Sequence, residues 1–205
     1  MKNFTRSPKG LLIPATRAVV EWGNKHLVLS KWIFRSNRLI FYELEVMMLV
    51  ITLFCIGLLF VIHLLPKIIA IFICILLFQR LVEFVIVYSR NFIFRTGRIF
   101  SDFPNPQKQG EWLIMMFFMN IVQVIVIFSI WYRVISLHVT DSFSQVMGVL
   151  DSLYFSVVTF LTVGYGDITP VEPLAKGLVL FQSILTFYIL VIVINGLISI
   201  HFHRK

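Results

Sequence analysis

The sequence contains few charged residues and little cysteine. Charged residues make up 14% of the 205 residues and hydrophobic residues 59%, and the mean hydropathy is +0.90. This balance excludes the ordinary soluble globular class and indicates an integral membrane protein. The two cysteines, Cys55 and Cys74, lie within long apolar runs without a paired motif. We therefore expect small buried side chains there rather than a disulfide or a metal site.

The sequence also lacks the residue patterns that catalysis or a bound cofactor would need. No Ser-His-Asp or Cys-His nucleophile arrangement, phosphate-binding loop or His/Cys metal cluster is recognisable. We therefore expect neither an enzyme nor a cofactor. No cleavable signal peptide is evident, because the first forty residues are basic and are interrupted by Pro8 and Pro14 before any long apolar run.

Four apolar segments are long enough to cross the hydrocarbon core of a bilayer, which takes about 20 residues as a helix. They lie at about 44–64, 68–88, 112–136 and 174–200. The apolar stretch 151–161 is too short to span, so we expect it to enter the membrane and return, surrounded by protein or water. The predicted fold class is an all-α integral membrane protein, with four transmembrane helices and one re-entrant helix per subunit.

The positions of Lys and Arg predict the orientation in the membrane. Eight lie before residue 40, four lie between residues 90 and 108, and two end the chain. By the positive-inside rule these segments are cytoplasmic, and so are both termini. The sequence pI near 9.8 therefore reflects a multi-pass topology in a plasma or inner membrane rather than nucleic-acid binding.

The chain is expected to divide into three parts. Residues 1–43 form a basic amphipathic segment suited to the cytoplasmic surface of an anionic membrane, although a solvated arm has a similar composition. Residues 44–109 form a transmembrane hairpin and a linker, and residues 110–205 form the last unit. Trp131 and Tyr132, near the end of the third span, are expected to be interfacial aromatics.

Arg80 and Glu83 stand within the second predicted span, where a charge is costly. Three residues apart on a helix, they can face one another. Two interpretations remain open: a polar pair that holds the hairpin to the rest of the protein, or a part in gating. A voltage sensor of the usual kind is not expected, because Arg and Lys do not recur at every third position.

Residues 162–167 read Thr-Val-Gly-Tyr-Gly-Asp, a pattern that can turn consecutive backbone carbonyls toward a bare cation. Gly164 and Gly166 suit this role because glycine tolerates positive φ. The sequence has no internal repeat, so one chain supplies only one such strand. A closed ring around an ion therefore requires several copies, and a fourfold cyclic homo-oligomer is the natural solution.

From about residue 110 to 203, the order of span, short helix, filter and span resembles the pore domain of the potassium channel superfamily. Residues 151–170 align with the family pattern without a gap. The resemblance implies a homotetrameric channel that conducts K⁺ passively. It also implies that the third unit is the pore domain. The filter then comprises Thr162, Val163, Gly164, Tyr165 and Gly166. The Thr162 hydroxyl and the carbonyls of the first four of these residues coordinate K⁺.

The chain departs from the family pattern around the filter. Tyr154 and Phe155 occupy positions that commonly hold a Trp pair, and Val158 stands where some members have a Glu. The Tyr154 hydroxyl could still donate a hydrogen bond to Asp167, so we expect these two residues to support the filter. Leu161 replaces a second Thr and removes a hydroxyl beneath the filter.

The inner helix has no glycine between residues 184 and 194, and Asn195-Gly196 lies lower. This pair is expected either to mark a gate or the pore lining, or to pack against a neighbouring helix. Two other functions remain possible for the chain as a whole. One is a modulatory or nonconducting subunit of a potassium channel, and the less favoured one is a subunit of an active potassium uptake system.

Overall fold

The computed structural model describes residues 18, 21–22, 40–89 and 106–202. Within the two long ranges, side chains are described at 46–87, at 89 and at 114–192. The predicted membrane-surface segment 1–43 lies almost wholly outside the described residues, as does the connection 90–105. Those two predictions therefore remain untested.

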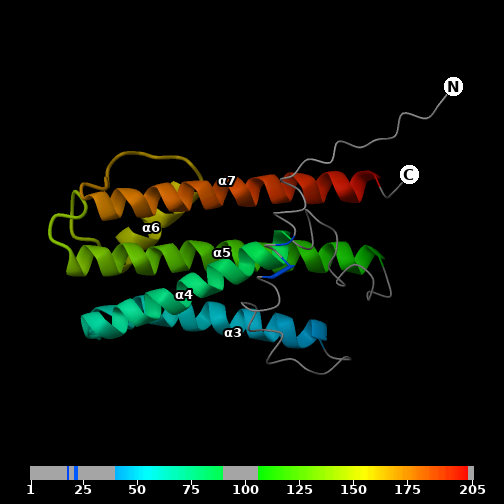
Figure 1. Cartoon of the computed structure of the whole chain (residues 1–205), viewed down its shortest axis with the longest axis horizontal. Coiled ribbons are helices and arrows are strands. Elements are labelled where there is room, and N and C mark those ends of the chain that lie inside the picture. Colours follow the sequence, from blue (N-terminus) through cyan, green and yellow to red (C-terminus); the bar gives the residue numbers. More distant parts are fainter. Residues whose placement is uncertain (1–17, 19–20, 23–39, 90–105, 203–205) are drawn as a thin grey trace.

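The described chain is helical, and its helices follow one another along a single bundle (Figure 1). The elements are α3 Ile40–Val61, the 3₁₀ turn η1 Ile62–Leu64, α4 Lys67–Tyr88, α5 Pro106–His138, α6 Val149–Phe160 and α7 Pro173–Phe202. Four segments are long and apolar enough to cross a membrane: Val46–Leu64, Lys67–Val87, Ile114–His138 and Pro173–Ile192. With 12 residues, α6 is too short to cross. The predicted all-α fold with four spans and one short helix is confirmed.

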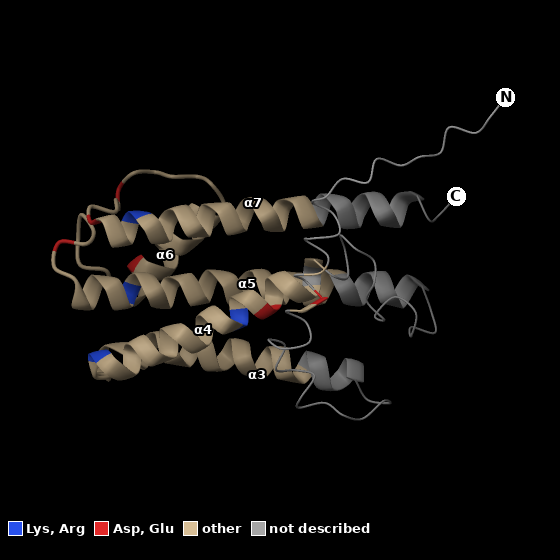
Figure 2. Ribbon diagram, in the orientation of Figure 1, with Lys and Arg blue, Asp and Glu red and all other residues tan. Residues whose placement is uncertain are grey.

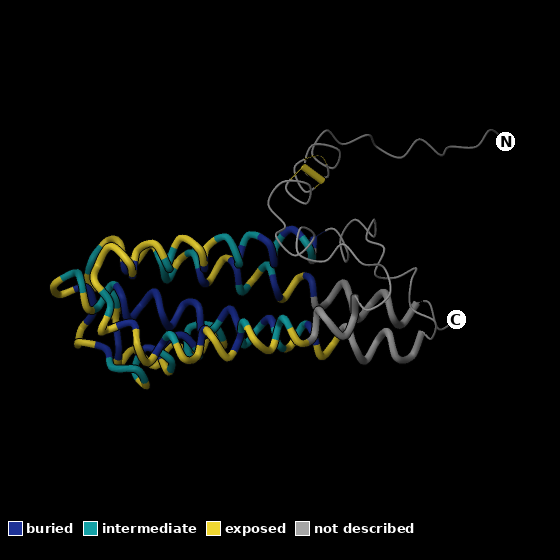
Figure 3. The backbone as a smooth tube through the Cα atoms, turned by 90° about the horizontal axis from the view of Figure 1, so that it is seen from below, coloured by how far each residue is buried: buried dark blue, intermediate teal, exposed yellow. Residues whose placement is uncertain are grey.

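The helix α5 lies at the centre of the bundle, with the α3–α4 hairpin on one side and α6 and α7 on the other (Figure 1). Of the membrane-length segment in α5, 56% is buried, against 22% in α3 and 28% in both α4 and α7. Figure 3 shows the same difference as a largely buried central helix among helices with exposed outer faces. The outer faces are apolar, as lipid contact requires.

The α3–α4 turn, the C-terminal end of α5 and the N-terminal end of α7 lie at the same end of the bundle (Figure 1). A four-span topology with a loop entering from one side predicts this arrangement. Prolines set the helix starts, because Pro66 precedes α4, Pro106 begins α5 and Pro173 begins α7. The start of α5 at Pro106 lies slightly before the predicted boundary at residue 110.

Candidate functional site

The loop between α6 and α7 carries residues 162–167, which include the filter that the sequence predicted, and we call it the filter loop. All of these residues are exposed in the single chain. The angle φ is 56° at Thr162, 59° at Gly164 and 80° at Gly166, whereas the intervening Val163 and Tyr165 have negative φ. In a strand, successive carbonyls point in opposite directions, but a backbone whose φ alternates in sign permits them to face one side. The loop therefore has a backbone that permits its consecutive carbonyls to face one side.

Thr162 is the unexpected member of this loop, because it adopts positive φ without being glycine. A left-handed conformation costs an ordinary residue about 1–2 kcal/mol. Such strain persists only where the surroundings enforce it, and it is common at functional sites. The sequence indicated positive φ at the two glycines but gave no signal for Thr162.

The end of α6 holds the start of the loop through three backbone hydrogen bonds. The N–H groups of Leu161, Thr162 and Val163 donate to the carbonyls of Val157, Thr159 and Val158, at 2.8, 3.1 and 3.0 Å respectively. These bonds satisfy carbonyls that the end of a helix otherwise leaves without a partner. Any displacement of the last turn of α6 is therefore transmitted directly to Thr162 and Val163.

The start of α6 has a well-defined cap. The helix begins at Val149, two residues earlier than the apolar stretch predicted, and the Asp151 carboxylate accepts a 2.9 Å hydrogen bond from the Gly148 N–H. An acidic group in the first turn also interacts favourably with the helix dipole. The cap fixes one end of α6, and the loop bonds fix the other.

Tyr154 of α6 lies close to Asp167, just beyond the filter. Its interaction with the Asp167 side chain is the main cause of a raised Tyr154 pKa, with smaller contributions from desolvation and from the charges of Asp167 and Tyr165. The contact joins the middle of α6 to the outer end of the loop. The predicted support of the filter by these two residues stays a prediction.

A second set of contacts holds the outer rim of the loop. The segment after α5 pairs with the segment after the filter through an isolated antiparallel bridge between Phe143 and Pro170. The Ser144 N–H donates to the Thr169 carbonyl at 2.9 Å, and the Thr169 N–H donates to the Ser144 hydroxyl at 3.0 Å. The filter loop is thus attached at its inner end to α6 and at its outer end to the rim.

Behind α6 lies a buried polar network that the sequence analysis did not single out. Gln182 of α7 accepts a 2.5 Å hydrogen bond from the Tyr132 hydroxyl and donates to the Ser156 carbonyl at 2.9 Å. The Ser156 hydroxyl in turn donates to the Ile125 carbonyl of α5 at 2.7 Å. Tyr132, Ser156 and Gln182 are all completely buried. We call these three residues and the Ile125 carbonyl the Gln182 network; it joins α5, α6 and α7.

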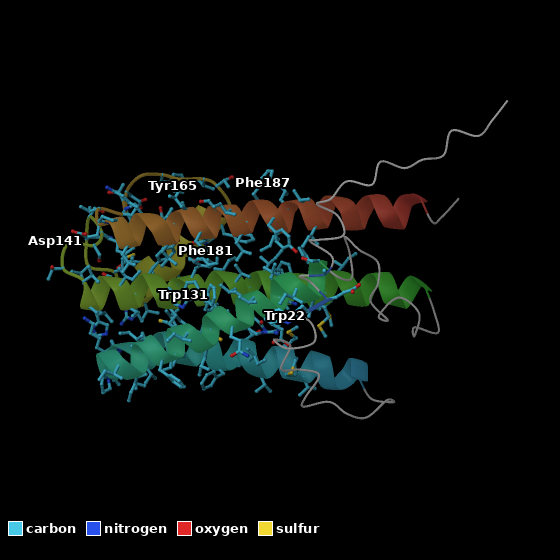
Figure 4. All side chains as sticks on the ribbon, viewed as in Figure 1. Trp22, Trp131, Asp141, Tyr165, Phe181 and Phe187 are labelled. Atoms are coloured by element: carbon cyan, nitrogen blue, oxygen red, sulfur yellow. The ribbon has the colours of Figure 1, made fainter. Side chains whose placement is uncertain are left out.

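The position of Tyr132 corrects one expectation. Trp131 and Tyr132 were expected to be interfacial aromatics, but Trp131 is only 8% exposed and Tyr132 is completely buried. The Tyr132 ring packs edge-on against Phe155 of α6 with a centroid separation of 4.9 Å, and Trp131 stacks with Phe181 of α7 at 6.3 Å (Figure 4). Aromatic side chains here fill the protein core because α5 is the central helix.

Arg80 and Glu83 form the ion pair that the sequence predicted. The Arg80 Nη1 lies 3.1 Å from the Glu83 Oε2. Figure 2 shows a basic and an acidic residue next to one another on α4, away from the start of the helix. The Arg80 Nε donates to the Gln123 Oε1 of α5 at 3.3 Å, and the Gln123 amide donates to the Thr52 hydroxyl of α3 at 2.9 Å. The pair therefore joins three helices and does not contact the filter loop.

The hairpin also reaches α7 directly. The Tyr188 hydroxyl donates a 3.0 Å hydrogen bond to the Val85 carbonyl of α4 and lies in close contact with the Ser89 hydroxyl. Nearer the filter end, Phe78 of α4 packs against Phe181 at a centroid distance of 6.2 Å. The hairpin thus contacts α7 at two positions along its length.

Asn195 and Gly196 lie within α7, but the Asn195 side chain and the surroundings of both residues fall outside what the structure describes. Their predicted part in a gate or in the pore lining therefore stays a prediction. No group of three or more His, Cys, Asp or Glu residues that could hold a metal ion occurs in the described part of the chain. The filter loop itself offers backbone oxygens rather than a cluster of charged ligands.

Residues 110–202 match the protein family described as "Ion channel". The match covers a little under half of the chain, and it indicates a channel rather than an enzyme. We call this segment the pore domain after that similarity. By the resemblance that the sequence showed, α5 corresponds to the outer helix, α6 to the pore helix and α7 to the inner helix.

Three curated relatives resemble parts of the chain. Two pore potassium channel c of Oryza sativa subsp. japonica is 36% identical over 69 residues, covering 34% of this chain and 15% of the relative. Two-pore potassium channel 2 of Arabidopsis thaliana is 38% identical over 61 residues, covering 29% and 14%. Potassium channel K1 of Plasmodium berghei is 45% identical over 51 residues, covering 25% and 3%. The chain thus spans at most 15% of these relatives' length. No solved structure matches the chain.

The pore domain contains functional candidates that the sequence could have indicated. Gln123 and Gln182 each interrupt a long apolar span, and an isolated polar residue at such a place usually has a specific partner. The partners themselves could not be predicted. They depend on how each helix is rotated about its axis, and these spans are apolar on nearly every side.

Proposed function

We propose that the chain is the subunit of a homotetrameric, potassium-selective channel that conducts K⁺ passively across a plasma or inner membrane. The observation that carries the proposal is the alternating φ of Thr162 to Gly166, in an exposed loop of an ion-channel pore domain. The names of the three relatives, all potassium channels, support K⁺ as the permeant ion. The channel needs no cofactor besides the permeant ion.

The proposed chemistry is the replacement of the water around a bare ion. The carbonyls of Thr162, Val163, Gly164 and Tyr165, with the Thr162 hydroxyl, coordinate K⁺ at successive sites along the axis. Fixed dipoles offset the cost of dehydration, and repulsion between neighbouring ions lets each one leave. Gly166 completes the filter and allows the chain to turn outward toward Asp167.

The exposed surface supports assembly around a central axis. On α7, Leu180, Ile184 and Phe187 are 65%, 69% and 67% exposed, and they recur at helical spacing along one face. Tyr165, itself 72% exposed, lies on the same side as Phe187, away from α5 (Figure 4). Contact between copies across this face brings the filter loops together and gives Tyr165 a partner to pack against.

Charge placement supports the orientation. With the filter loop entering from outside, Asp141, Asp167 and Glu172 lie near the outer mouth and concentrate cations there. The negative end of the α6 dipole points toward the inner side of the filter, and four such helices favour a cation in the central cavity. Both termini are then cytoplasmic, where residues 1–43 contact anionic lipids.

The test is to reconstitute the purified full chain into liposomes with opposed K⁺ and Na⁺ gradients, and to record current across a range of voltage and pH. We expect a reversal potential that follows K⁺, from a protein that is tetrameric by native mass measurement. A reversal potential that follows neither cation, or follows Na⁺, would contradict the proposal. A silent tetramer that alters the current of a co-expressed potassium channel would instead identify a modulatory subunit.

A further inference from the structure

Gln182 lies at the centre of the Gln182 network, and each end of its amide has a partner on a different helix. The amide nitrogen donates to the Ser156 carbonyl at 2.9 Å and lies 3.2 Å from the Ser156 hydroxyl, and the amide oxygen accepts from Tyr132. We propose that Gln182 is a positioning residue for the filter, which fixes the pore helix α6 between α5 and α7 and thereby sets ion selectivity. The inference rests on the proposed function as a potassium channel.

The place of Ser156 on α6 explains how Gln182 reaches the filter without touching it. Ser156 lies about one turn before the end of α6 at Phe160. It is held from one side by Gln182 and from the other by the Ile125 carbonyl of α5. The next three residues along the helix supply the carbonyls that anchor the start of the filter loop. A shift of Ser156 therefore moves the first two filter residues.

The network is a strong constraint because it is buried and its members satisfy one another. In a medium of low dielectric, a hydrogen bond is electrostatically stronger than in water, and an unpaired polar group is costly. If Gln182 loses its amide, the buried Tyr132 hydroxyl loses its acceptor and Ser156 keeps only its bond to α5. The pore helix then has more than one position of similar energy. A filter that discriminates by the number and spacing of its carbonyls loses selectivity when those carbonyls move.

A purely structural role for Gln182 predicts something different from a positioning role. An ion that binds only the folded filter raises the melting temperature as its concentration rises. The difference between the melting temperatures in K⁺ and in Na⁺ therefore reports the state of the filter. A structural residue lowers both temperatures together, whereas a positioning residue reduces the difference between them.

The experiment compares the wild type with Gln182→Met, which keeps the volume of the side chain and removes its amide. In the full chain in liposomes, we expect the ratio of K⁺ to Na⁺ permeability to fall about tenfold. This is about the factor by which the loss of one buried hydrogen bond changes an equilibrium constant, here that between the selective and the displaced positions of the pore helix. In detergent, we expect the gap between the melting temperatures in K⁺ and Na⁺ to narrow.

Two further variants keep the test decisive. Tyr132→Phe removes only the hydroxyl that donates to Gln182, and it leaves the ring packed on Phe155. Like Gln182→Met, it should therefore lower the K⁺ to Na⁺ permeability ratio and narrow the gap between the melting temperatures in K⁺ and Na⁺. Gln79→Met makes the same chemical change as Gln182→Met, but on α4, at a half-buried residue that is not part of the Gln182 network. This control should leave both readings unchanged.

The outcomes separate the inference from the proposed function. If the wild type is selective for K⁺ and both variants keep its selectivity and its melting-temperature gap, the inference is wrong and the proposed function stands. A wild type that shows no K⁺ selectivity overturns both. If neither variant can be recovered folded, a global structural role accounts for Gln182 and the inference also fails.

Discussion

The Nη1 of Arg80 lies 3.1 Å from the Oε2 of Glu83, one turn further along α4, and the same guanidinium donates to Gln123 of α5. The Arg80 and Glu83 side chains are only 12% and 8% exposed, so each charge depends on the other in a region that excludes water. The pair supports the interpretation that the hairpin is held to the pore domain by buried polar contacts.

Replacing Glu83 alone should therefore destabilise the protein strongly. Glu83→Gln leaves the buried Arg80 charge without its counter-charge, and we expect a loss of about 3–5 kcal/mol in the free energy of unfolding. The double variant Arg80→Met with Glu83→Leu should recover most of that loss, because an apolar pair of similar volume removes the cost of burying charge. Thermal unfolding in detergent measures both, and exposed Lys67→Met should change little. A Glu83→Gln protein as stable as the wild type would contradict this account of the hairpin.

The filter glycines give a prediction with a matched control inside the chain. At Gly164, φ is +59° and a Cβ would meet no atom of the same chain within 4 Å, so the cost of Gly164→Ala comes from backbone conformation. That cost is about 1–2 kcal/mol, enough to displace a carbonyl of the filter. We expect K⁺ selectivity or conduction to be lost in liposome recordings. Gly57→Ala in α3 also meets no atom within 4 Å but lies in a helix, so it should conduct as the wild type does.

The contact between Tyr154 and Asp167 predicts behaviour with pH as well as with mutation. Because the interaction with Asp167 raises the Tyr154 pKa above the ordinary value of 10.0, the hydroxyl stays protonated through neutral and mildly alkaline pH. The stabilisation from the contact with Asp167 is fully present below the ordinary pKa of tyrosine, and it is lost as pH rises through the raised pKa of Tyr154. Filter inactivation should therefore be insensitive to this group from pH 6 to 9.

The Tyr154→Phe variant tests the same contact without a change of pH. We expect faster or deeper inactivation of the current, and the same change in Asp167→Ala. Combining the two should add little further effect, since each single change already removes one side of the contact. Full additivity of the two effects would show that the residues act separately.

Tyr188 offers a test of the contact between the hairpin and the inner helix. Tyr188→Phe removes the hydroxyl that donates to the Val85 carbonyl, and we expect a loss of about 1 kcal/mol in the free energy of unfolding. Ser89→Ala should produce a smaller loss, because the Ser89 hydroxyl lies against the same Tyr188 hydroxyl. The measurement is the shift of the unfolding midpoint for each variant and for the pair, which should not be additive.

Much of this architecture could be predicted from the sequence, because membrane spans have strong local signals. Length and hydropathy fixed the four spans and the short α6 between them. The glycines at 164 and 166 predicted where φ is positive, and the spacing of Arg80 and Glu83 predicted their ion pair. Each of these inferences depends on residues within a few positions of one another.

The remaining features depend on contacts between distant segments. Tyr132 donates to Gln182 across fifty positions of sequence, and nothing local distinguishes a lipid-facing from a buried tyrosine near the end of a span. The positive φ of Thr162 comes from hydrogen bonds to the last turn of α6, not from its own preference. The burial of Trp131 follows from the central place of α5, which hydropathy does not report.

The central place of α5 has a mechanical consequence. A stretched or thinned bilayer pulls first on the helices that it touches, and the hairpin stands between much of α5 and the lipid (Figure 3). Membrane tension on that side reaches the outer helix α5 through the Arg80–Gln123 contact, and it reaches the inner helix α7 through the Tyr188 contact. The contacts of the hairpin with α5 and α7 thus determine how much of the membrane tension on that side is transmitted to the pore helices.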